Sequence, residues 1–257
     1  MLRFFFRHYD RFVTRYVIFD DGSTDGSIEL LRSNPRVELH RFVRSDPESF
    51  CLSEQELSNE CWRSSSSSAD WVIVTDIDEH LYHPQMPTLL SRYKELGITL
   101  VPALGYQMIS EQFPHDDELL CETRFRGAPW PHMCKLSLFD PAAITAINYD
   151  PGRHLARPEG HLVLPERDEV LLLHYKFLGF ERMRARHGEL LSGLGTKDIA
   201  NNWGHQYAWP EPRLREDWDT VARNAVDIRG LSPGDSYPLN LWWARYRQTC
   251  APTVNPA

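Results

Sequence analysis

Apolar residues recur with two different spacings along the chain, and together these spacings predict alternating helices and strands. Residues 2–13 carry apolar side chains at helical spacing and predict an amphipathic helix. Residues 16–19 and 71–74 are short, continuous apolar runs, which are typical of buried parallel strands. The same reasoning predicts further strands at 37–42, 99–104, 135–139 and 170–176, and helices at 27–32, 54–62 and from residue 180 onward.

This alternation favours an α/β fold in which a largely parallel sheet, with some mixed pairing, is flanked by helices. We expect the main α/β domain to occupy residues 1–180 and a helical C-terminal extension to occupy residues 181–257. Thr24 or Asp25 is the expected cap of the helix at 27–32. Residues 249–257 are polar and contain proline, so we expect this tail to fray.

The composition and net charge of the chain argue against some classes of binding partner. Of the 257 residues, 42% are hydrophobic, and the formal net charge of -8 gives no general attraction to nucleic acids or anionic lipids. No apolar run approaches the roughly 20 residues that span a bilayer. The five cysteines are scattered and form no CxxC pair, a pattern typical of reduced thiols in a cytosolic protein. We therefore expect a cytoplasmic protein that does not bind nucleic acid.

Two of the predicted strands end in a pair of carboxylates. Asp20 and Asp21 follow the strand at 16–19, and Asp76 and Asp78 follow the strand at 71–74. Ligands of open α/β sheets bind outside the carboxyl ends of the strands. Four carboxylates in one cleft repel each other unless a cation compensates, and hard oxygen ligands suit Mg²⁺ or Mn²⁺. The pattern therefore predicts a metal-bound diphosphate at one edge of a mainly parallel sheet, although residues 20–26 alone would indicate an ordinary turn.

The residues around both acidic pairs resemble known sequences. Residues 17–27, VIFDDGSTDGS, are similar to the nucleotide-binding sequence of family-2-type glycosyltransferases, which have the GT-A fold. Asn59 and residues 69–79, ADWVIVTDIDE, resemble the segment of these enzymes that leads into their DXD motif. The Asp-Ile-Asp-Glu variant, with Lys135 and residues 152–154 and 173–176, looks most like a bacterial subgroup active on surface polysaccharide or lipopolysaccharide. The resemblance covers residues 1–180.

The resemblance implies a glycosyltransferase that moves a sugar from a nucleotide-diphosphate sugar to a glycan or lipid-linked acceptor, with inversion at the anomeric carbon. Asp20, Asp21 and Ser23 would bind the base or ribose of the donor. Asp76 and Asp78 would hold Mn²⁺ or Mg²⁺ and the diphosphate, and the metal would stabilise the departing nucleoside diphosphate. A lipid-linked acceptor would bring the cytoplasmic protein to the inner face of the membrane, with which it would associate peripherally.

One departure from the family concerns the start of the chain. The family begins with a strand before the helix expected here at 2–13, and this sequence has no apolar strand there. We therefore expect a chain shortened at its start, with an exposed edge beside the strand at 16–19. An unpaired strand leaves backbone N–H and C=O groups without partners, so we also expect marginal stability and weak nucleotide binding. A non-catalytic remnant that binds nucleotide-sugars is an alternative function for such a chain.

Later residues supply candidates for the rest of the site. His174 and Lys176 share one face of the strand at 170–176. We expect His174 to complete the metal site and Lys176 to meet a phosphate, although a core histidine bonded to backbone is the common alternative. His154 is a similar candidate, whereas Lys135 has the position of an ordinary solvated lysine. An inverting transfer needs a carboxylate as base, for which we choose Glu111. The competing acids are Asp116, Asp117, Asp168 and Glu169, and the tryptophans that could stack on sugars instead of packing in the core are Trp130, Trp203 and Trp209.

A second enzymatic interpretation is a phosphohydrolase or phosphotransferase that uses Asp76 as its nucleophile. Such enzymes usually carry Gly or Thr after the acidic motif, where this chain has Glu79 and His80. They also lack an Asp-Asp-Gly-Ser turn upstream. The presence and order of the two motifs therefore favour the glycosyltransferase.

Overall fold

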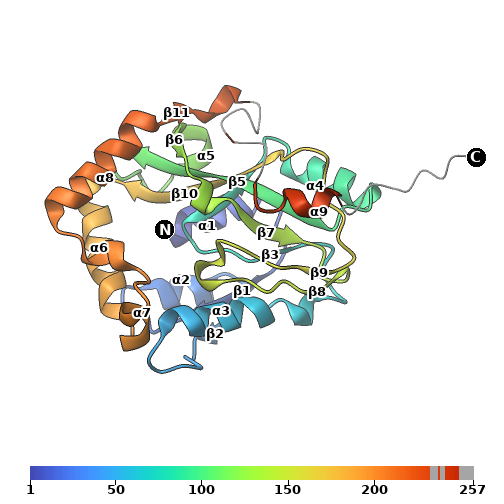
Figure 1. The fold of residues 1–257 in the computed structure, drawn as a ribbon, viewed down its shortest axis with the longest axis horizontal. Helices are drawn as coiled ribbons and strands as arrows, with labels where there is room; N and C mark the ends of the chain where they lie inside the picture. Colours follow the sequence, from blue (N-terminus) through green and yellow to red (C-terminus); the bar gives the residue numbers. More distant parts are fainter. Residues whose placement is uncertain (232–236, 238–240, 249–257) are drawn as a thin grey trace, which may run out of the picture.

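The long apolar segment β5 (Leu100–Ser110) forms the middle of a seven-stranded mixed sheet in the computed structural model, which describes residues 1–231, 237 and 241–248 (Figure 1). β10 (Val170–Leu178) pairs in parallel with one side of β5. The other strands of this sheet are β3 (Val72–Ile73), β4 (Glu79–Tyr82), β6 (Arg126–Pro129), β7 (Lys135–Phe139) and β11 (Val226–Asp227). The described chain is therefore mixed α/β, with a curled mixed sheet flanked by helices.

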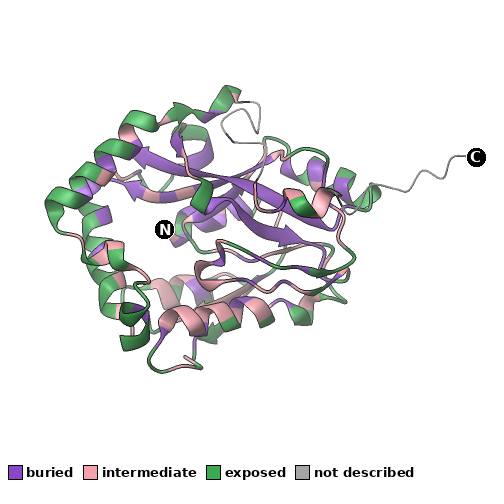
Figure 2. Cartoon of the chain, viewed as in Figure 1, coloured by how far each residue is buried: buried purple, intermediate pink, exposed green. Residues whose placement is uncertain are grey.

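The apolar runs of the central strands are continuous because both faces of this sheet are covered. Leu171 and Leu173 of β10 pack into one apolar cluster, whereas Val170 and Leu172 pack into another. Successive side chains of a strand point to opposite faces, so the two clusters lie on opposite sides of the sheet. Figure 2 shows the resulting concentration of buried residues in the strands.

The prediction of a largely parallel sheet is wrong for this sheet, because β5 and β10 are its only parallel pair among the described strands. β6 and β7 both run antiparallel to β5. The segments between β5, β6 and β7 contain only the four-residue helix α5 (Leu120–Thr123) and the three-residue 3-10 helix Pro131–Met133. A parallel neighbour needs a long crossover, usually a full helix, so these segments favour antiparallel return.

The first predicted strand lies in a separate sheet. β1 (Tyr16–Asp20) pairs in parallel with β2 (Val37–Arg41), and α2 (Ser27–Ser33) forms the crossover between them. Within the described residues β1 has no partner on its other side, which is the exposed edge expected from the sequence. The prediction that both acidic pairs end strands of one sheet is therefore wrong, since β3 belongs to the larger sheet.

Helix α1 (Leu2–Tyr9) links the two sheets through an apolar cluster. Phe5, Phe6 and Tyr9 pack with Tyr16 at the start of β1, and Ile73 of β3 packs against the same cluster. The helix ends at Tyr9, earlier than predicted, and the Tyr16 hydroxyl donates a hydrogen bond of 2.7 Å to Asp10 just beyond its end. The start of β1 and the end of β3 thus pack against the same group of aromatic side chains.

The C-terminal helices form an arc along one side of the molecule (Figure 1). α6 (Phe180–Gly193) begins directly after β10, and α8 (Glu211–Asn224) shares an apolar cluster with it through Trp218. α7 (Thr196–Ala200) reaches α3 (Phe50–Glu60), where buried Asp198 accepts backbone hydrogen bonds at the start of that helix. The remaining elements include α4 (Met86–Glu95), β8 (Ile144–Ala146), β9 (Glu159–Gly160) and α9 (Ala244–Gln248).

The remaining findings concern one helix boundary, the predicted tail and the membrane. α3 begins at Phe50, four residues before its predicted start, because the Ser49 hydroxyl caps it by accepting a hydrogen bond from the backbone of Leu52. The predicted tail at 249–257 lies outside the described residues. None of the helices in the described ranges has the length and apolar character needed to cross a membrane.

Candidate functional site

The turn after β1 is organised by its first aspartate. One carboxylate oxygen of Asp20 accepts hydrogen bonds from the backbone N–H groups of Gly22 and Ser23, at 2.8 and 3.0 Å. Burial by itself would raise the pKa of Asp20, but hydrogen bonds from the Ser23 hydroxyl and from the backbone of Ser23 and Gly22 hold this pKa below the usual value. Gly22 has a φ of +84°, which glycine adopts without strain. Asp20 therefore shapes the turn.

Asp21 and Ser23 lie at the exposed surface of the same turn. The Asp21 carboxylate forms an ion pair of 3.0 Å with Arg44, which comes just after β2. The predicted cap of α2 is different in the structure, since Gly26 occupies the N-cap position with a φ of +81°. Asp25 instead accepts a hydrogen bond from the backbone N–H of Ser27. The turn thus presents Asp21 and Ser23 to solvent.

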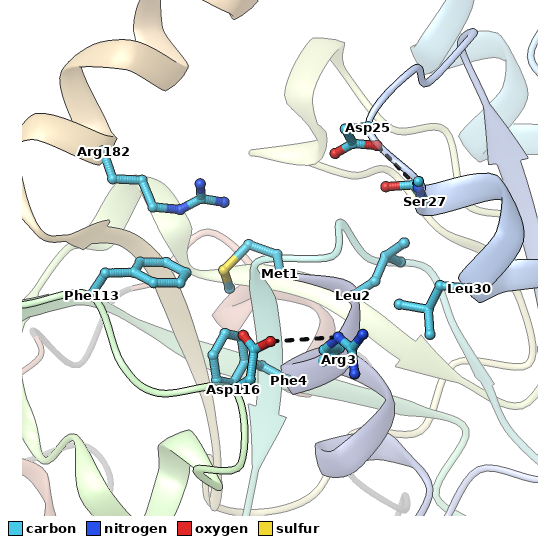
Figure 3. A pocket seen from close by; sticks show the side chains of 11 residues that line it. Met1, Leu2, Arg3, Phe4, Asp25, Ser27, Leu30, Phe113, Asp116 and Arg182 are labelled. Atoms are coloured by element: carbon cyan, nitrogen blue, oxygen red, sulfur yellow. Dashed lines mark hydrogen bonds and ion pairs between the residues drawn. The ribbon is translucent and has the colours of Figure 1, made fainter.

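A cavity of about 310 Å³ lies beside this turn (Figure 3). Its walls come from four parts of the chain: residues 1–4 at the start of α1, residues 25–27 with Leu30 at the start of α2, Phe113 with Asp116 after β5, and Arg182 of α6. The Arg182 side chain extends from α6 over the Phe113 ring, with its guanidinium carbon 4.3 Å from the ring centroid. The cavity therefore connects the turn after β1 with the helix that follows β10.

Asp76 and Asp78 follow β3 and have different surroundings. The Asp76 side chain is 55% exposed, and Arg153 approaches both of its carboxylate oxygens, at 3.0 and 3.3 Å. The Asp78 side chain is 30% exposed, and its Oδ2 lies 3.6 Å from Nε2 of His174. The two aspartates are two residues apart, yet one is paired with an arginine and the other with a histidine.

His174 is oriented by a glutamine on the neighbouring strand. The Nδ1 atom of His174 lies 2.7 Å from the Gln107 side-chain oxygen, and the Gln107 amide donates a hydrogen bond of 3.0 Å to the His174 backbone oxygen. Nδ1 is therefore used within the sheet, and Nε2 faces Asp78. Burial alone would raise the pKa of Asp78, but His174 and Lys176 outweigh it and hold this pKa below its usual range.

Lys176 follows His174 by two residues in β10 and lies near Asp78. Burial lowers the pKa of its ammonium group to about 8, even though nearby Asp78 favours the charged form. The ammonium nitrogen lies 4.4 Å from the centre of the Tyr207 ring. A cation at this position, with a carboxylate and an imidazole beside it, suits the recognition of a phosphate.

A buried ion pair supports the chain next to these aspartates. Lys135 donates a hydrogen bond of 2.5 Å to Glu79, and the two side chains are 3% and 2% exposed. Burial would raise the pKa of Glu79, but Lys135 and Arg153 hold this pKa below its usual value. The prediction of a solvated Lys135 is wrong, because the carboxylate of Glu79 gives its charge a partner inside the protein.

The other predicted residues have varied surroundings, and of these Trp130 lies next to His174. Glu111 is exposed just beyond β5, and Asp116, also exposed, forms an ion pair of 3.6 Å with Arg3. His154 stacks on His132 with ring centroids 3.6 Å apart. The other predicted acids and tryptophans are placed as follows: Asp117 is exposed, Asp168 pairs with Arg247, Glu169 pairs with Arg92, Trp130 has its ring 6.5 Å from that of His174, and Trp203 and Trp209 are half-buried.

Sequence reasoning assigned no role in the site to Glu79, Gln107 or Arg153, although Glu79 and Arg153 belong to the segments that carry the resemblance. Glu79 begins β4 and Lys135 begins β7, and most residues of both strands are buried. A charge in a strand that packs inside the protein needs a partner of opposite charge, and this is the signal that points to the pair. Gln107, between Tyr106 and Met108, carries the same kind of signal for a buried hydrogen bond.

Few side chains of the candidate site could act as ligands of a metal cation. Within the described ranges, no group of three or more His, Cys, Asp or Glu side chains is arranged as a metal site. Asp78 and His174 supply one carboxylate and one imidazole, and Mn²⁺ accepts both ligand types. Ions of this class often complete their coordination with substrate phosphates and water. The donor set therefore fits a metal bound together with a diphosphate.

Comparisons with known proteins add no relative: no family model matches the chain, and no curated protein matches it at a significant level. The function is therefore argued from the geometry of the site.

Proposed function

We propose that the chain is a metal-dependent glycosyltransferase of the family-2 type with a GT-A-like fold. It would move a sugar from a nucleotide-diphosphate sugar to a glycan or lipid-linked acceptor, with inversion. The observation that carries the proposal is the pairing of Asp78 with His174, 3.6 Å apart and contributed by segments almost 100 residues apart in sequence. Lys176 adds a cation beside this pair, as a diphosphate ligand requires.

Each residue of the pair has a definite role in this proposal. Asp78 and His174 would hold Mn²⁺ or Mg²⁺, and the bound metal would supply Lewis-acid stabilisation of the departing nucleoside diphosphate. Gln107 fixes the His174 ring so that Nε2 faces Asp78. Lys176 would donate hydrogen bonds to a phosphate oxygen, since a group with a pKa of about 8 is largely protonated at neutral pH.

The donor's nucleoside would bind at the turn after β1. Asp21 and Ser23 are exposed there, and the cavity beside the turn leads toward Arg182. For the acceptor hydroxyl, Glu111 stays our proposed base, because it is exposed just beyond the end of β5, the strand that pairs with β10. We place the reaction in the cytoplasm at the inner face of the membrane, in the synthesis of surface polysaccharide or lipopolysaccharide.

One observation favours a second candidate, a protein that binds nucleotide-sugars without turnover. β1 carries the turn that would bind the nucleoside, and it pairs on one side only among the described strands. A phosphohydrolase with Asp76 as nucleophile is less well supported. Arg153 contacts both oxygens of that carboxylate, and a charge-assisted pair with a guanidinium makes a carboxylate a weaker nucleophile.

A thermal-shift screen of nucleotide-sugars with and without Mn²⁺ tests the proposal. A ligand at 100 times its dissociation constant adds about 2.7 kcal/mol to the free energy of unfolding, which is readily visible. We expect at least one donor to stabilise the wild type in a Mn²⁺-dependent way and to lose that effect in Asp78→Asn. Asp70→Asn is the matched control, since Asp70 is exposed and pairs only with Lys94 among the described residues. Stabilisation that is equal with and without Mn²⁺, or unchanged in Asp78→Asn, would contradict the roles assigned here.

A further inference from the structure

A tyrosine of the C-terminal extension reaches the candidate site from outside residues 1–180, which carry the resemblance. Tyr207 lies in the 3-10 helix His205–Ala208, between α7 and α8. Its ring covers the ammonium group of Lys176, whose nitrogen lies 4.4 Å from the ring centre. Lys176 follows His174 by two residues in β10, so Tyr207 borders the place where we propose a phosphate.

The hydrogen-bond donors of Tyr207 and Lys176 have no acceptors in the described part of the chain. No hydrogen bond or ion pair joins the Lys176 ammonium group or the Tyr207 hydroxyl to a described residue. Burial, and then the charges of nearby Asp78 and Asp76, raise the pKa of the Tyr207 hydroxyl to about 12, so it is protonated at neutral pH. Three N–H groups and one O–H group are therefore available to a ligand at this place. An anion with several oxygen atoms would accept from all of them.

The position of Tyr207 is fixed by its own segment and by α6. The ring of His187 in α6 lies roughly perpendicular to the Tyr207 ring, with centroids 5.3 Å apart. Gly204 precedes the 3-10 helix with a φ of +67°, and a Cβ atom there would lie 2.9 Å from the Tyr207 ring, so this close approach requires glycine. The backbone N–H of Trp203 donates a hydrogen bond to the backbone oxygen of Asp198, whose side chain is bonded to the start of α3. Tyr207 is thus held in place before a ligand binds.

We infer that Tyr207 is a further donor-binding residue: its hydroxyl donates a hydrogen bond to a diphosphate oxygen of the nucleotide-sugar, and its ring holds the Lys176 ammonium group beside the same diphosphate. This inference rests on the proposed function and adds to it a contact from the helical extension. The face of the ring attracts the ammonium ion and leaves N–H groups on its other side for the ligand. The diphosphate therefore binds between β10 and the 3-10 helix.

Removing the hydroxyl weakens diphosphate binding without weakening the fold. Tyr207→Phe keeps the ring over Lys176 and removes an oxygen to which no described residue is bonded, so the melting temperature changes little. A hydrogen bond to a charged ligand is lost, and the dissociation constant for pyrophosphate or a nucleoside diphosphate rises about tenfold or more. Tyr207→Leu also removes the face of the ring, so its dissociation constant rises further. A tyrosine that served packing alone would leave the affinity of Tyr207→Phe unchanged.

Isothermal titration calorimetry with Mg²⁺ present measures these constants for inorganic pyrophosphate, UDP, GDP and ADP. Pyrophosphate isolates the diphosphate contact, because it carries neither base nor sugar. The wild type is compared with Tyr207→Phe, Tyr207→Leu and Lys176→Met, and thermal unfolding reports whether each variant is folded. The matched control is Tyr82→Phe, since Tyr82 lies in β4 opposite Leu171 and its hydroxyl also has no hydrogen-bond partner among the described residues. Should Tyr207→Leu fail to fold, Tyr207→Phe decides.

The outcomes separate the inference from the proposed function. Weaker binding of pyrophosphate and of a nucleoside diphosphate in Tyr207→Phe, with wild-type affinity in Tyr82→Phe, is the result that the geometry predicts. Wild-type affinity in Tyr207→Phe, together with a loss in Lys176→Met, would overturn the inference and leave the proposed function standing. A loss in Tyr207→Phe, without release of nucleoside diphosphate from any sugar donor, would support the diphosphate contact and count against the transferase. Failure of the wild type to bind any of the four ligands would overturn both.

Discussion

Replacing Lys135 by methionine should destabilise the protein far more than a typical charge substitution. Its side chain is 3% exposed, and its partner Glu79 is 2% exposed and 2.5 Å away. Removing one member of a buried ion pair leaves an uncompensated charge, at a cost of about 3–5 kcal/mol. Glu79 keeps its contact with Arg153, so we expect the lower end of this range, about 3 kcal/mol. For a chain of this length that corresponds to roughly 6–12 °C in the melting temperature.

Urea unfolding of four variants measures this effect and isolates the pair. Lys135→Met, Glu79→Gln and the double variant form a cycle, in which the double variant should cost less than the two single variants together. Arg186→Met is the control: its ion pair with Glu189 has side chains that are 52% and 63% exposed, and such pairs contribute about 0–1 kcal/mol. A loss below about 1 kcal/mol in Lys135→Met, equal to that of the control, would refute the reasoning.

Three further outcomes are expected. Asp198→Ala should lower the free energy of unfolding by about 2–4 kcal/mol in urea, because the buried carboxylate accepts four hydrogen bonds. The pKa of His8 is lowered by burial to about 4, so the native state holds it neutral and loses about 3 kcal/mol as pH falls from 6.5 toward 4; His8→Gln should flatten that part of the stability profile. Asp21→Asn should weaken donor binding in calorimetry yet change stability by less than about 1 kcal/mol, since its pair with Arg44 is exposed.

The strands were predicted well wherever their apolar runs are continuous. β7 occupies 135–139 as predicted, and β10 begins at the predicted residue and extends two residues further. Both have apolar residues on two faces, so a run such as residues 170–173 of β10 shows no alternation between apolar and polar positions. The direction of pairing could not be read in this way, because a buried strand has the same composition in parallel and antiparallel surroundings.

The residues of the candidate site were easier to predict from the sequence than the contacts between them. The sequence places Asp78 after a strand and His174 within one, but their meeting depends on β4 lying antiparallel to β10, which no local pattern encodes. Lys135 was expected in solvent, since a lysine at the start of a strand usually reaches water. Its burial is explained by the carboxylate of Glu79, which comes from an element 56 residues before it.

The central claim is that Asp78 and His174 form a metal-dependent site for a nucleotide-sugar. Its most direct test is the release of nucleoside diphosphate from a panel of UDP-, GDP- and ADP-sugars by the purified chain. The account predicts release that requires Mn²⁺ or Mg²⁺, is abolished in Asp78→Asn and in His174→Ala, and is unchanged in Asp70→Asn. Release that persists in Asp78→Asn, or that is equal in the presence of EDTA, would contradict it.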